Sequence, residues 1–383
     1  AFNPLRIPYG VEFRTRRFVE FLRTKGEVDL LTLERISEST DMDYIRRSYR
    51  QHHALDALGK PSSNWKRLLH QLPWQLGQLY NDAAQRAIVK ILEENNYDLI
   101  FISKLYPVRY FIDLPAKWLK KVVMDFDDIL SDLYRHYYKN FITSRKNSFA
   151  LRLYEHRAMK RFKRVFICSD DALQKISPRY HKKVGIIPNV FEVKTDRFLK
   201  PSGNTYELLF VGSLDYFPNQ EGLSWFLKTI WPEAKKEFAN LKLTIIGKTW
   251  KNLADVNKQL GNWPAVEIAV NVESVVPYYQ KCFASIVPLL DGSGTRIKIL
   301  ESASFGRPVF TTLKGMEGLE FKDKKEIFLF KDATTFIEAY QVLLADETYH
   351  QVARDAFQAL QEKYSPRNFG IQMKNNWEEI VRL

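Results

Sequence analysis

The chain has 383 residues, of which 45% are hydrophobic and 27% charged, and its formal net charge is +13. This length predicts two domains, because a single core seldom grows beyond about 250–300 residues. The apolar content excludes an intrinsically disordered chain, and no apolar run approaches the ~20 residues of a membrane span. Since no signal peptide is recognised either, we expect a cytoplasmic protein, soluble or peripheral on the inner face of the membrane.

Apolar strand-like runs alternate with amphipathic helical patterns in the first half of the chain, which favours a doubly wound parallel sheet. The predicted helices are 12–25, 42–57, 65–94 and one that opens after the N-cap cluster Ser169–Asp171. The predicted strands are 28–33, 99–102, 121–125 and 164–168. Cys168 and Cys282 both lie in apolar runs, so we expect buried thiols, with a disulfide between them as the alternative.

Positive charge is concentrated in the segment 135–164, where Glu155 is the only acid and aromatic residues are interleaved with Lys and Arg. A basic and aromatic helix can lie on an anionic membrane surface. The alternative is a solvated basic helix face whose aromatic side chains pack on their own domain. No helix-turn-helix, zinc or RNA-platform motif accompanies the charge, so nucleic acid is not an expected partner.

The second half of the chain repeats the alternation of strands and helices. Strands are predicted at 208–211, 241–246, 266–269, 284–288 and 308–311. Helices are predicted at 220–238, 253–260, 274–281, 296–305, 333–345, 347–364 and 366–383. The segment 191–204, with its Lys, Pro, Ser and Gly residues, is predicted to link the two domains.

The most informative stretch is 285–312, in which a buried strand, a loop at Asp291–Gly294, a short helix from about Thr295 and another buried strand follow one another. A glycine-rich turn that opens a helix is a natural anion site, because the first amides lack partners and the helix dipole attracts negative charge. Ile297, Leu300 and Ser304 have helical spacing and are expected to face the core.

Two basic residues and then an acidic residue follow this turn. Arg296 and Lys298 come first, and Glu301 lies three residues beyond Lys298 on the same helix face. A diphosphate joined to a ribose would need two cations followed by a carboxylate that accepts from the ribose hydroxyls. The alternative is a surface ion pair between Lys298 and Glu301 beside an ordinary glycine turn.

This segment resembles the donor-binding motif of the retaining family-4 glycosyltransferases of the GT-B fold (glycosyltransferase group 1). Three more segments agree in order: 206–219 with the first strand and loop of that family's C-terminal domain, 241–247 with its second strand, and 187–190 with the Pro-Asn junction of the domains. The resemblance implies an α/β protein of two Rossmann-like domains with doubly wound parallel sheets, an interdomain cleft and a C-terminal crossover helix.

The resemblance also implies domain bounds. Residues 1–190, completed by the helix 366–383, would form the acceptor-binding domain, and residues 191–365 would bind the nucleotide-sugar donor. Family members begin with a short buried strand, whereas this sequence opens on Ala1–Pro4 and a loop, so the first strand is expected to be missing or truncated.

Residue roles follow from the resemblance. Lys298 and Arg296 would stabilise the departing nucleoside diphosphate, although Arg296 has the alternative of lying over the surface. Glu301 would bind the ribose. Amide groups facing phosphate and sugar would come from Gly292, Ser293, Gly294 and Thr295. Gly10 lies in the loop that corresponds to the family's flexible loop beside the donor phosphates.

The chain departs from the family pattern at several donor-binding positions. Ser293 stands where family members often have a glutamate that faces the donor sugar. Ser213 stands in place of an arginine and Asn219 near the place of a lysine, both of which meet the diphosphate. We keep Ser213 and Asn219 as donor-binding candidates, and the site is expected to depend more heavily on Lys298 and Arg296.

Asp127 is the catalytic candidate of the first domain. It lies near the end of the run 122–128, which is predicted to be a buried strand. The family frequently has a histidine near this position that touches the reacting sugar. An aspartate there would bond a sugar hydroxyl, orient the acceptor or accept its proton. The alternative is that Asp127 or Asp128 caps a helix starting at Ile129.

The run Asp125-Phe-Asp127 superficially matches the metal-binding Asp-x-Asp of the other common glycosyltransferase fold. Because the C-terminal signature belongs to the metal-independent fold, we expect no metal site and no cofactor. The interpretation is a retaining hexosyltransferase of polysaccharide biosynthesis, with a UDP- or GDP-linked donor and a glycan or lipid-linked glycan acceptor. The alternatives are a non-catalytic nucleotide- or membrane-binding partner subunit and a sugar-nucleotide epimerase of the same fold.

Overall fold

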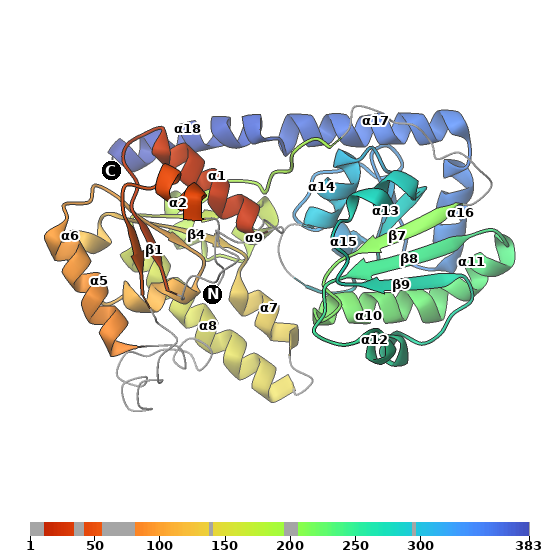
Figure 1. Cartoon of the computed structure of the whole chain (residues 1–383), viewed down its shortest axis with the longest axis horizontal. Helices are drawn as coiled ribbons and strands as arrows, with labels where there is room; N and C mark the ends of the chain where they lie inside the picture. Colours follow the sequence, from red (N-terminus) through yellow and green to blue (C-terminus); the bar gives the residue numbers. More distant parts are fainter. Residues whose placement is uncertain are drawn as a thin grey trace. The chain divides into compact units, whose positions relative to one another are not determined.

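A computed structural model describes residues 11–33, 42–55, 81–137, 141–194, 206–292 and 296–382 (Figure 1). The chain divides into two compact units. Unit 1 comprises residues 1–189 and 369–383, and unit 2 comprises residues 190–368. The predicted helix over 65–80, the opening residues with Gly10, and most of the predicted linker lie outside the described residues.

Unit 1 holds two parallel sheets. In the smaller sheet β1 (Leu30–Thr32) pairs with β2 (His52–Ala54). The larger sheet has the order β3-β4-β5-β6, with strands at Ile100–Ser103, Val122–Asp127, Arg164–Ile167 and Val184–Ile186. The predicted helix 42–57 is wrong at its end, since α2 stops at Ser48 and β2 follows. A three-residue strand is too short to show an alternation, and pairing with β1 decides its conformation.

The helices of unit 1 are α1 (Val11–Arg23), α2 (Met42–Ser48), η1 (Tyr106–Tyr110), α5 (Asp82–Glu94), α6 (Ala116–Leu119), α7 (Leu130–Tyr137), α8 (Phe141–Arg161), α9 (Asp170–Gln174) and η2 (Pro178–Lys183). Of these, α1 and α9 fall close to the predicted ranges, whereas the predicted helix 65–94 is wrong at Asn81, an extended N-cap after which α5 begins. Ser169 caps α9 by accepting a hydrogen bond from the Ala172 amide, as its position predicts. Cys168 and Cys282 are both buried free thiols, which confirms that prediction.

The two sheets of unit 1 face each other across a cavity of about 610 Å³. Leu30–Thr32 of β1 line it on one side and Ile100–Ser103 of β3 on the other. Apolar side chains of α1 and α5, such as Val19 and Ile88, also line it. The described strands of unit 1 therefore form two sheets rather than one continuous sheet.

Helix α18 (Pro366–Arg382) joins unit 1 from Phe369 onward. The Phe369 ring packs edge-on against Phe18 at 5.2 Å between centroids. The Asn376 side chain accepts a hydrogen bond of 2.8 Å from Arg164 in β5. These contacts attach the last helix of the chain to α1 and the sheet of unit 1. Within the described ranges no helix has the length and apolarity needed to cross a membrane.

Helices α7 and α8 lie side by side in unit 1 (Figure 1). Glu155 of α8 is almost wholly buried, and its carboxyl group accepts hydrogen bonds from the Ser131 amide at 3.0 Å and the Ser131 hydroxyl at 2.6 Å. The opening turn of α7 thus has a carboxyl partner from α8, whereas Asp127 or Asp128 was the predicted cap. Burial raises the pKa of Glu155 from 4.5 to about 7.

Replacing Glu155 by Gln should change how stability depends on pH. The unfolded chain releases the Glu155 proton near pH 4.5, whereas the folded protein keeps it until about pH 7. Stability is therefore lost as pH rises through this window, by roughly 3 kcal/mol. Urea unfolding of Glu155→Gln should show a free energy of unfolding without this pH-dependent loss. Relative to the wild type, the stability of the variant should therefore increase between pH 4.5 and 8. Glu93→Gln, at an exposed site of the same unit, should leave the dependence of stability on pH unchanged. The prediction would be contradicted if Glu155→Gln and the wild type showed the same dependence.

Unit 2 holds one parallel sheet with the order β12-β11-β10-β7-β8-β9. Its strands are β7 (Glu207–Val211), β8 (Lys242–Gly247), β9 (Val266–Val270), β10 (Ala284–Val287), β11 (Val309–Thr311) and β12 (Phe328–Leu329). The first three strands run outward from β7 and the next three run outward from β10 on the other side. This is the doubly wound order of Rossmann-type sheets, with its topological switch point between β7 and β10.

Helices flank this sheet (Figure 1). They are α10 (Phe217–Trp225), the π-helical turn η3 (Phe226–Ile230), α11 (Trp231–Glu237), α12 (Leu253–Leu260), α13 (Val276–Lys281), α14 (Ile297–Ser304), α15 (Leu313–Met316), α16 (Ala333–Leu343) and α17 (Asp346–Lys363). Together α10, η3 and α11 form the predicted helix 220–238 with an earlier start. The sheet core is rich in aromatic rings, among them Phe226, Phe310, Phe336 and Tyr340.

Candidate active site

The candidate site of unit 2 lies at the switch point of its sheet. In doubly wound sheets, ligands bind outside the carboxyl ends of the strands where the strand order reverses. Here β7 ends at Val211 and runs into Gly212 and Ser213, while β10 ends at Val287 and leads to α14. Lys298 and Glu301 both belong to α14, so the topology brings this helix to the place where a ligand is expected.

Lys298 is held against the end of β7. Its ammonium group donates a hydrogen bond to the Asn219 side chain and lies 4.7 Å from the centre of the Phe210 ring. Asn219 in turn donates to the Ser213 carbonyl at 2.7 Å. A Cβ atom at Gly212 would come within 2.7 Å of the Lys298 ammonium, so a larger residue there would displace the end of the lysine side chain. The structure thus brings together Lys298, Asn219 and Ser213, three of the predicted donor-binding residues.

The surroundings of Lys298 disfavour its charge. Burial, together with the nearby Arg296 guanidinium, lowers the pKa of Lys298 to about 7, although Glu301 acts in the opposite direction. An ammonium group that is partly removed from water and has few nearby negative charges is stabilised strongly when an anion binds to it. This electrostatic setting fits a group that binds phosphate.

Glu301 is positioned by a residue that the sequence analysis did not single out. The Tyr279 hydroxyl donates a hydrogen bond of 3.0 Å to one Glu301 oxygen. Tyr279 is itself buried and stacks on Phe305 at 4.6 Å between ring centres. Burial raises the pKa of Glu301, while the tyrosine hydrogen bond lowers it. Within the described residues Lys298 and Glu301 form no ion pair, so the alternative of a surface ion pair between them is wrong.

Replacing Tyr279 by Phe should weaken donor binding through Glu301. The variant keeps the stacked ring and removes only the hydroxyl that fixes the carboxylate. We expect the KM for the donor to rise by about fivefold to tenfold, which corresponds to one lost hydrogen bond to a charged group, with a smaller change in kcat. In a Glu301→Gln background the same change should have little further effect. An unchanged KM in Tyr279→Phe would contradict this role.

The start of α14 differs in detail from the prediction. Helical geometry begins at Ile297, and Ser293, Gly294 and Thr295 lie outside the described residues. The buried face consists of Ile299, Leu300, Ser302, Ala303 and Ser304. Ile297 is partly buried and packs against the apolar cluster that contains Leu300, and Ser304 is buried as well. The predicted core-facing stripe of Ile297, Leu300 and Ser304 is therefore confirmed.

Arg296 is buried and does not lie over the surface, which corrects that alternative. Its guanidinium donates to the Gly292 carbonyl at 2.9 Å and lies 3.7 Å from a Glu317 oxygen. Gly292 has a φ of +116°, a conformation that favours glycine. These contacts hold the loop before α14, and a part for Arg296 in phosphate binding stays a prediction.

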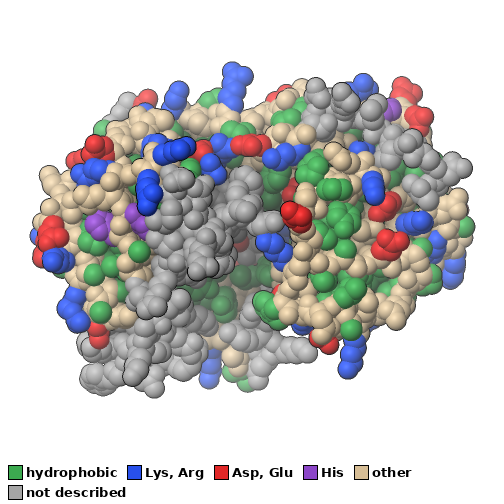
Figure 2. Space-filling view, in the orientation of Figure 1, with side chains coloured by type: hydrophobic (Ala, Val, Ile, Leu, Met, Phe, Trp, Pro, Cys, Tyr) green, Lys and Arg blue, Asp and Glu red, His purple; other side chains and the backbone are tan. Residues whose placement is uncertain are grey.

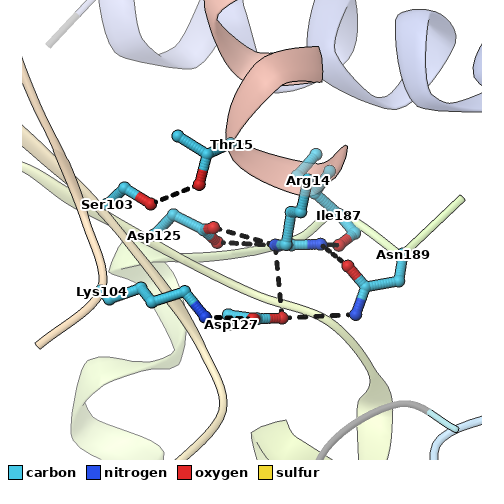
Figure 3. A network of polar contacts seen from close by, with 8 residues as sticks. All are labelled: Arg14, Thr15, Ser103, Lys104, Asp125, Asp127, Ile187 and Asn189. Carbon is cyan, nitrogen blue, oxygen red and sulfur yellow. Dashed lines mark hydrogen bonds and ion pairs between the residues drawn. The ribbon is translucent and has the colours of Figure 1, made fainter. Parts of the chain in front are cut away.

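A second polar cluster occupies the C-terminal end of β4 in unit 1 (Figure 3). Arg14 of α1 donates to both oxygens of Asp125, the shortest contact being 2.7 Å. Its remaining nitrogen reaches the Ile187 carbonyl at 2.5 Å and the Asn189 side chain at 3.2 Å. Figure 3 shows Asp127 beside this group, bonded to Lys104 at 3.0 Å and Asn189 at 3.3 Å.

Asp127 has an unusual backbone conformation, and its carboxylate lies between two cationic side chains. Its φ is +60°, and Lys104 has a φ of +69°. Left-handed non-glycine residues persist only where their surroundings hold them, and they gather at functional sites. Burial alone would raise the pKa of Asp127, but Lys104 and Arg14 lower it below its ordinary value. An ionised carboxylate of this kind accepts hydrogen bonds well and is a poor proton acceptor.

The carboxyl groups near β4 do not fit a metal ion. Asp127, Asp128 and Cys168 carry ligand atoms within 4.8 Å of one another. However, the Asp127 carboxylate already faces the ammonium of Lys104, and Arg14 lies 3.7 Å away. A divalent cation would have to displace or repel both positive groups. We therefore derive no chemistry from a metal in this cluster.

Several functional candidates were absent from the sequence-based site. Each of these residues lies more than 20 positions along the sequence from the residue to which it is hydrogen-bonded: Tyr279, Arg14, Lys104 and Asn189. Asn189 belongs to the Pro-Asn junction, and its conspicuous position was the one signal that could have drawn attention to it. No local spacing links Tyr279 to Glu301 or Arg14 to Asp125, so folding alone brings these pairs together.

Comparisons with known proteins bear on the fold and on the family of the second unit. Residues 205–346 match the family described as glycosyl transferases group 1. An uncharacterized 44.6 kDa protein in the cps region of Klebsiella pneumoniae is 25% identical over 379 residues, covering 94% of this chain and 93% of that protein. Sucrose-phosphate synthase from Thermosynechococcus elongatus has a similar structure (TM-score 0.71, 15% identity, 98% of this chain and 94% of that chain).

HepE from Anabaena, whose crystal structure contains UDP and glucose, is also similar (TM-score 0.66, 14% identity, 97% of this chain and 96% of that chain). These structural likenesses bear on the fold, and the family match bears on the class of protein. Both confirm the resemblance inferred from the motifs in the second half of the chain. The chain has the GT-B fold, and its residues 205–346 match the family described as glycosyl transferases group 1.

Proposed function

We propose that this glycosyltransferase retains the anomeric configuration and transfers a hexose from a UDP-linked donor, with a GDP-linked donor as the alternative. The acceptor in this proposal is a glycan or lipid-linked glycan of polysaccharide biosynthesis. The capsule-region origin of the Klebsiella pneumoniae relative supports the acceptor class, and the UDP and UDP-glucose complexes of Anabaena HepE support the donor class.

The observation that carries the proposal is the setting of Lys298. Its ammonium group lies at the switch point of the sheet of unit 2, beside a glycine that leaves room for it, and burial weakens its charge. The Glu301 carboxylate is positioned one helical turn further by Tyr279. In the proposed reaction Lys298 stabilises the diphosphate as it leaves, and Glu301 accepts hydrogen bonds from the ribose. Positive side chains would then meet the leaving charge without a bound metal ion.

Asp127 has a separate part in this proposal. Because its pKa is lowered by Lys104 and Arg14, the carboxylate would act as a hydrogen-bond acceptor for a sugar hydroxyl rather than as a general base. The strained backbone at Asp127 supports a site whose geometry is held in advance of binding.

A ligand screen tests the donor assignment. Thermal unfolding would be followed with UDP-glucose, GDP-mannose and ADP-glucose, since a ligand that binds the folded state raises the melting temperature by mass action. We expect a UDP-sugar to give the largest shift. Product analysis by NMR with the same donor should then show an unchanged anomeric configuration. Absence of a shift with every sugar nucleotide would contradict the donor site, and an inverted product would contradict the retaining mechanism.

Donor affinity should also weaken as pH rises. The pKa of Lys298 is about 7 in the free protein, and a bound diphosphate would raise it. Between these two values binding takes up a proton, so the dissociation constant for UDP-glucose should increase by up to about tenfold for each pH unit above 7. Titration calorimetry from pH 6.5 to 8.5 measures this. Lys298→Arg, which keeps its charge throughout, should give a flat profile, and equal wild-type affinity at both ends would contradict the assignment.

A further inference from the structure

The outward face of α8 exposes large apolar side chains. Ile142 is 63% exposed, Phe149 64% and Leu153 55%. Their spacing of seven and four residues places them on one stripe of the helix. The opposite face packs into the core of unit 1 through residues such as Leu151 and Tyr154. Helix α8 therefore carries apolar side chains on two opposite sides, one of them packed in the core of unit 1 and the other largely exposed.

Basic residues surround the exposed stripe. Lys146 lies within it, Arg145 and Arg152 border it, and Lys160 continues it toward the end of the helix, all of them exposed. The only acid in α8 is Glu155, which is buried against Ser131 on the inner side. The outer face of α8 thus combines apolar side chains with positive charge and presents no carboxylate of its own.

The predicted interleaving of aromatic and basic residues in 135–164 resolves into two groups. Tyr154 and Phe162 are buried in the core of unit 1, as the solvated-face alternative expected. Phe149 points outward with the basic residues. On the view of Figure 2, by contrast, Lys and Arg side chains are interspersed with Asp and Glu over both units. The apolar side chains and basic borders of the outer face of α8 thus lie on one helix, without an intervening carboxylate.

We propose that the outer face of α8, defined by Ile142, Lys146, Phe149, Arg152 and Leu153, is a docking surface for an anionic lipid bilayer. Apolar side chains of an interfacial helix enter the boundary between headgroups and acyl chains, while its cations meet anionic headgroups. The charge of the face complements such a membrane. A second copy of the chain is a poor occupant, because like charges would face each other across the interface. The inference does not depend on the donor site.

Vesicle co-sedimentation of the full chain tests this surface in the absence of any sugar nucleotide. The vesicles are phosphatidylcholine alone and an equimolar mixture of phosphatidylcholine and phosphatidylglycerol. We expect binding to the mixed vesicles, weakened by salt, and little binding to phosphatidylcholine alone. Phe149→Ser/Leu153→Ser and Lys146→Glu/Arg152→Glu should each reduce the partition coefficient by at least about tenfold. Neither pair touches the residues assigned to the donor site, so donor-induced thermal shifts should be unchanged.

Matched controls separate the surface from bulk charge and hydrophobicity. Lys228→Glu/Lys258→Glu changes the net charge equally at exposed sites of unit 2, and Val342→Ser/Ile371→Ser removes exposed apolar side chains elsewhere. Both control variants should bind vesicles like the wild type. A polarity-sensitive dye on Phe149→Cys should shift to the blue on mixed vesicles, whereas the same dye on Val342→Cys should not. The dye experiment remains decisive if the double serine variant fails to fold.

Several results would overturn the inference. One is equal binding to both kinds of vesicle, and another is unchanged binding by both α8 variants. A third is a concentration-dependent dimer in analytical ultracentrifugation that Phe149→Ser/Leu153→Ser abolishes, with no vesicle binding by the wild type. Binding of RNA through these residues in place of vesicles would also exclude the membrane.

Discussion

Replacing Lys298 by Met should strongly reduce sugar transfer while leaving the protein at least as stable as the wild type. Preorganised positive charge at a leaving group supplies much of the catalysis in such sites, so we expect kcat to fall by about 100- to 1,000-fold. Stability should not suffer, because burial already disfavours the charge of Lys298 and methionine fills the same space without it. Steady-state transfer assays and thermal unfolding of the same preparation measure the two effects.

Opposite effects on activity and stability distinguish a functional lysine from a structural one. Lys258→Met, at an exposed site of the same unit, should change neither quantity. Gly212→Ala should lower activity less than Lys298→Met, since its Cβ only displaces the flexible end of the lysine. Full transfer activity in Lys298→Met would show that the switch point of unit 2 is not the donor site.

Replacing Arg14 by Met should destabilise unit 1 more than any other substitution considered for that unit. The guanidinium is buried and bonds to Asp125, the Ile187 carbonyl and Asn189. Its removal leaves the Asp125 carboxylate buried without its cation, which typically costs about 3–5 kcal/mol. Urea unfolding monitored by circular dichroism measures the loss. Because Arg14 connects α1 with β4 and the segment after β6, the arrangement around Asp127 should loosen as well.

An exposed ion pair provides the matched comparison. Lys90 and Glu94 lie one turn apart on α5 with both side chains largely in solvent. Lys90→Met should therefore cost no more than about 0.5 kcal/mol. The double variant Arg14→Met/Asp125→Leu should recover part of the stability lost in Arg14→Met, since no charge is then buried alone. A loss in Arg14→Met no larger than in Lys90→Met would mean that this network contributes little to folding.

Local patterns were sufficient for much of unit 2. Short apolar runs separated by helical periods predicted β7 to β11 to within a residue or two, and the doubly wound class followed from their alternation. The order Arg296, Lys298, Glu301 after a glycine-rich turn located the candidate site, because a strand, a turn and a helix N-terminus are set by neighbouring residues. The N-cap at Ser169 was equally local. Such features depend on interactions over a few residues, which a sequence displays directly.

Other features were decided by contacts between distant parts of the chain. Lys298 bonds to Asn219, 79 residues away, and Arg14 bonds to Asp125, 111 residues away. Tyr279 meets Glu301 only because α13 and α14 lie near each other at the same sheet. Strand β2 forms because β1 lies beside it, and Arg296 bonds to the Gly292 carbonyl across the residues before α14. Periodicity and propensity specify which face of an element is apolar, but the partners of its polar side chains are chosen when the elements pack.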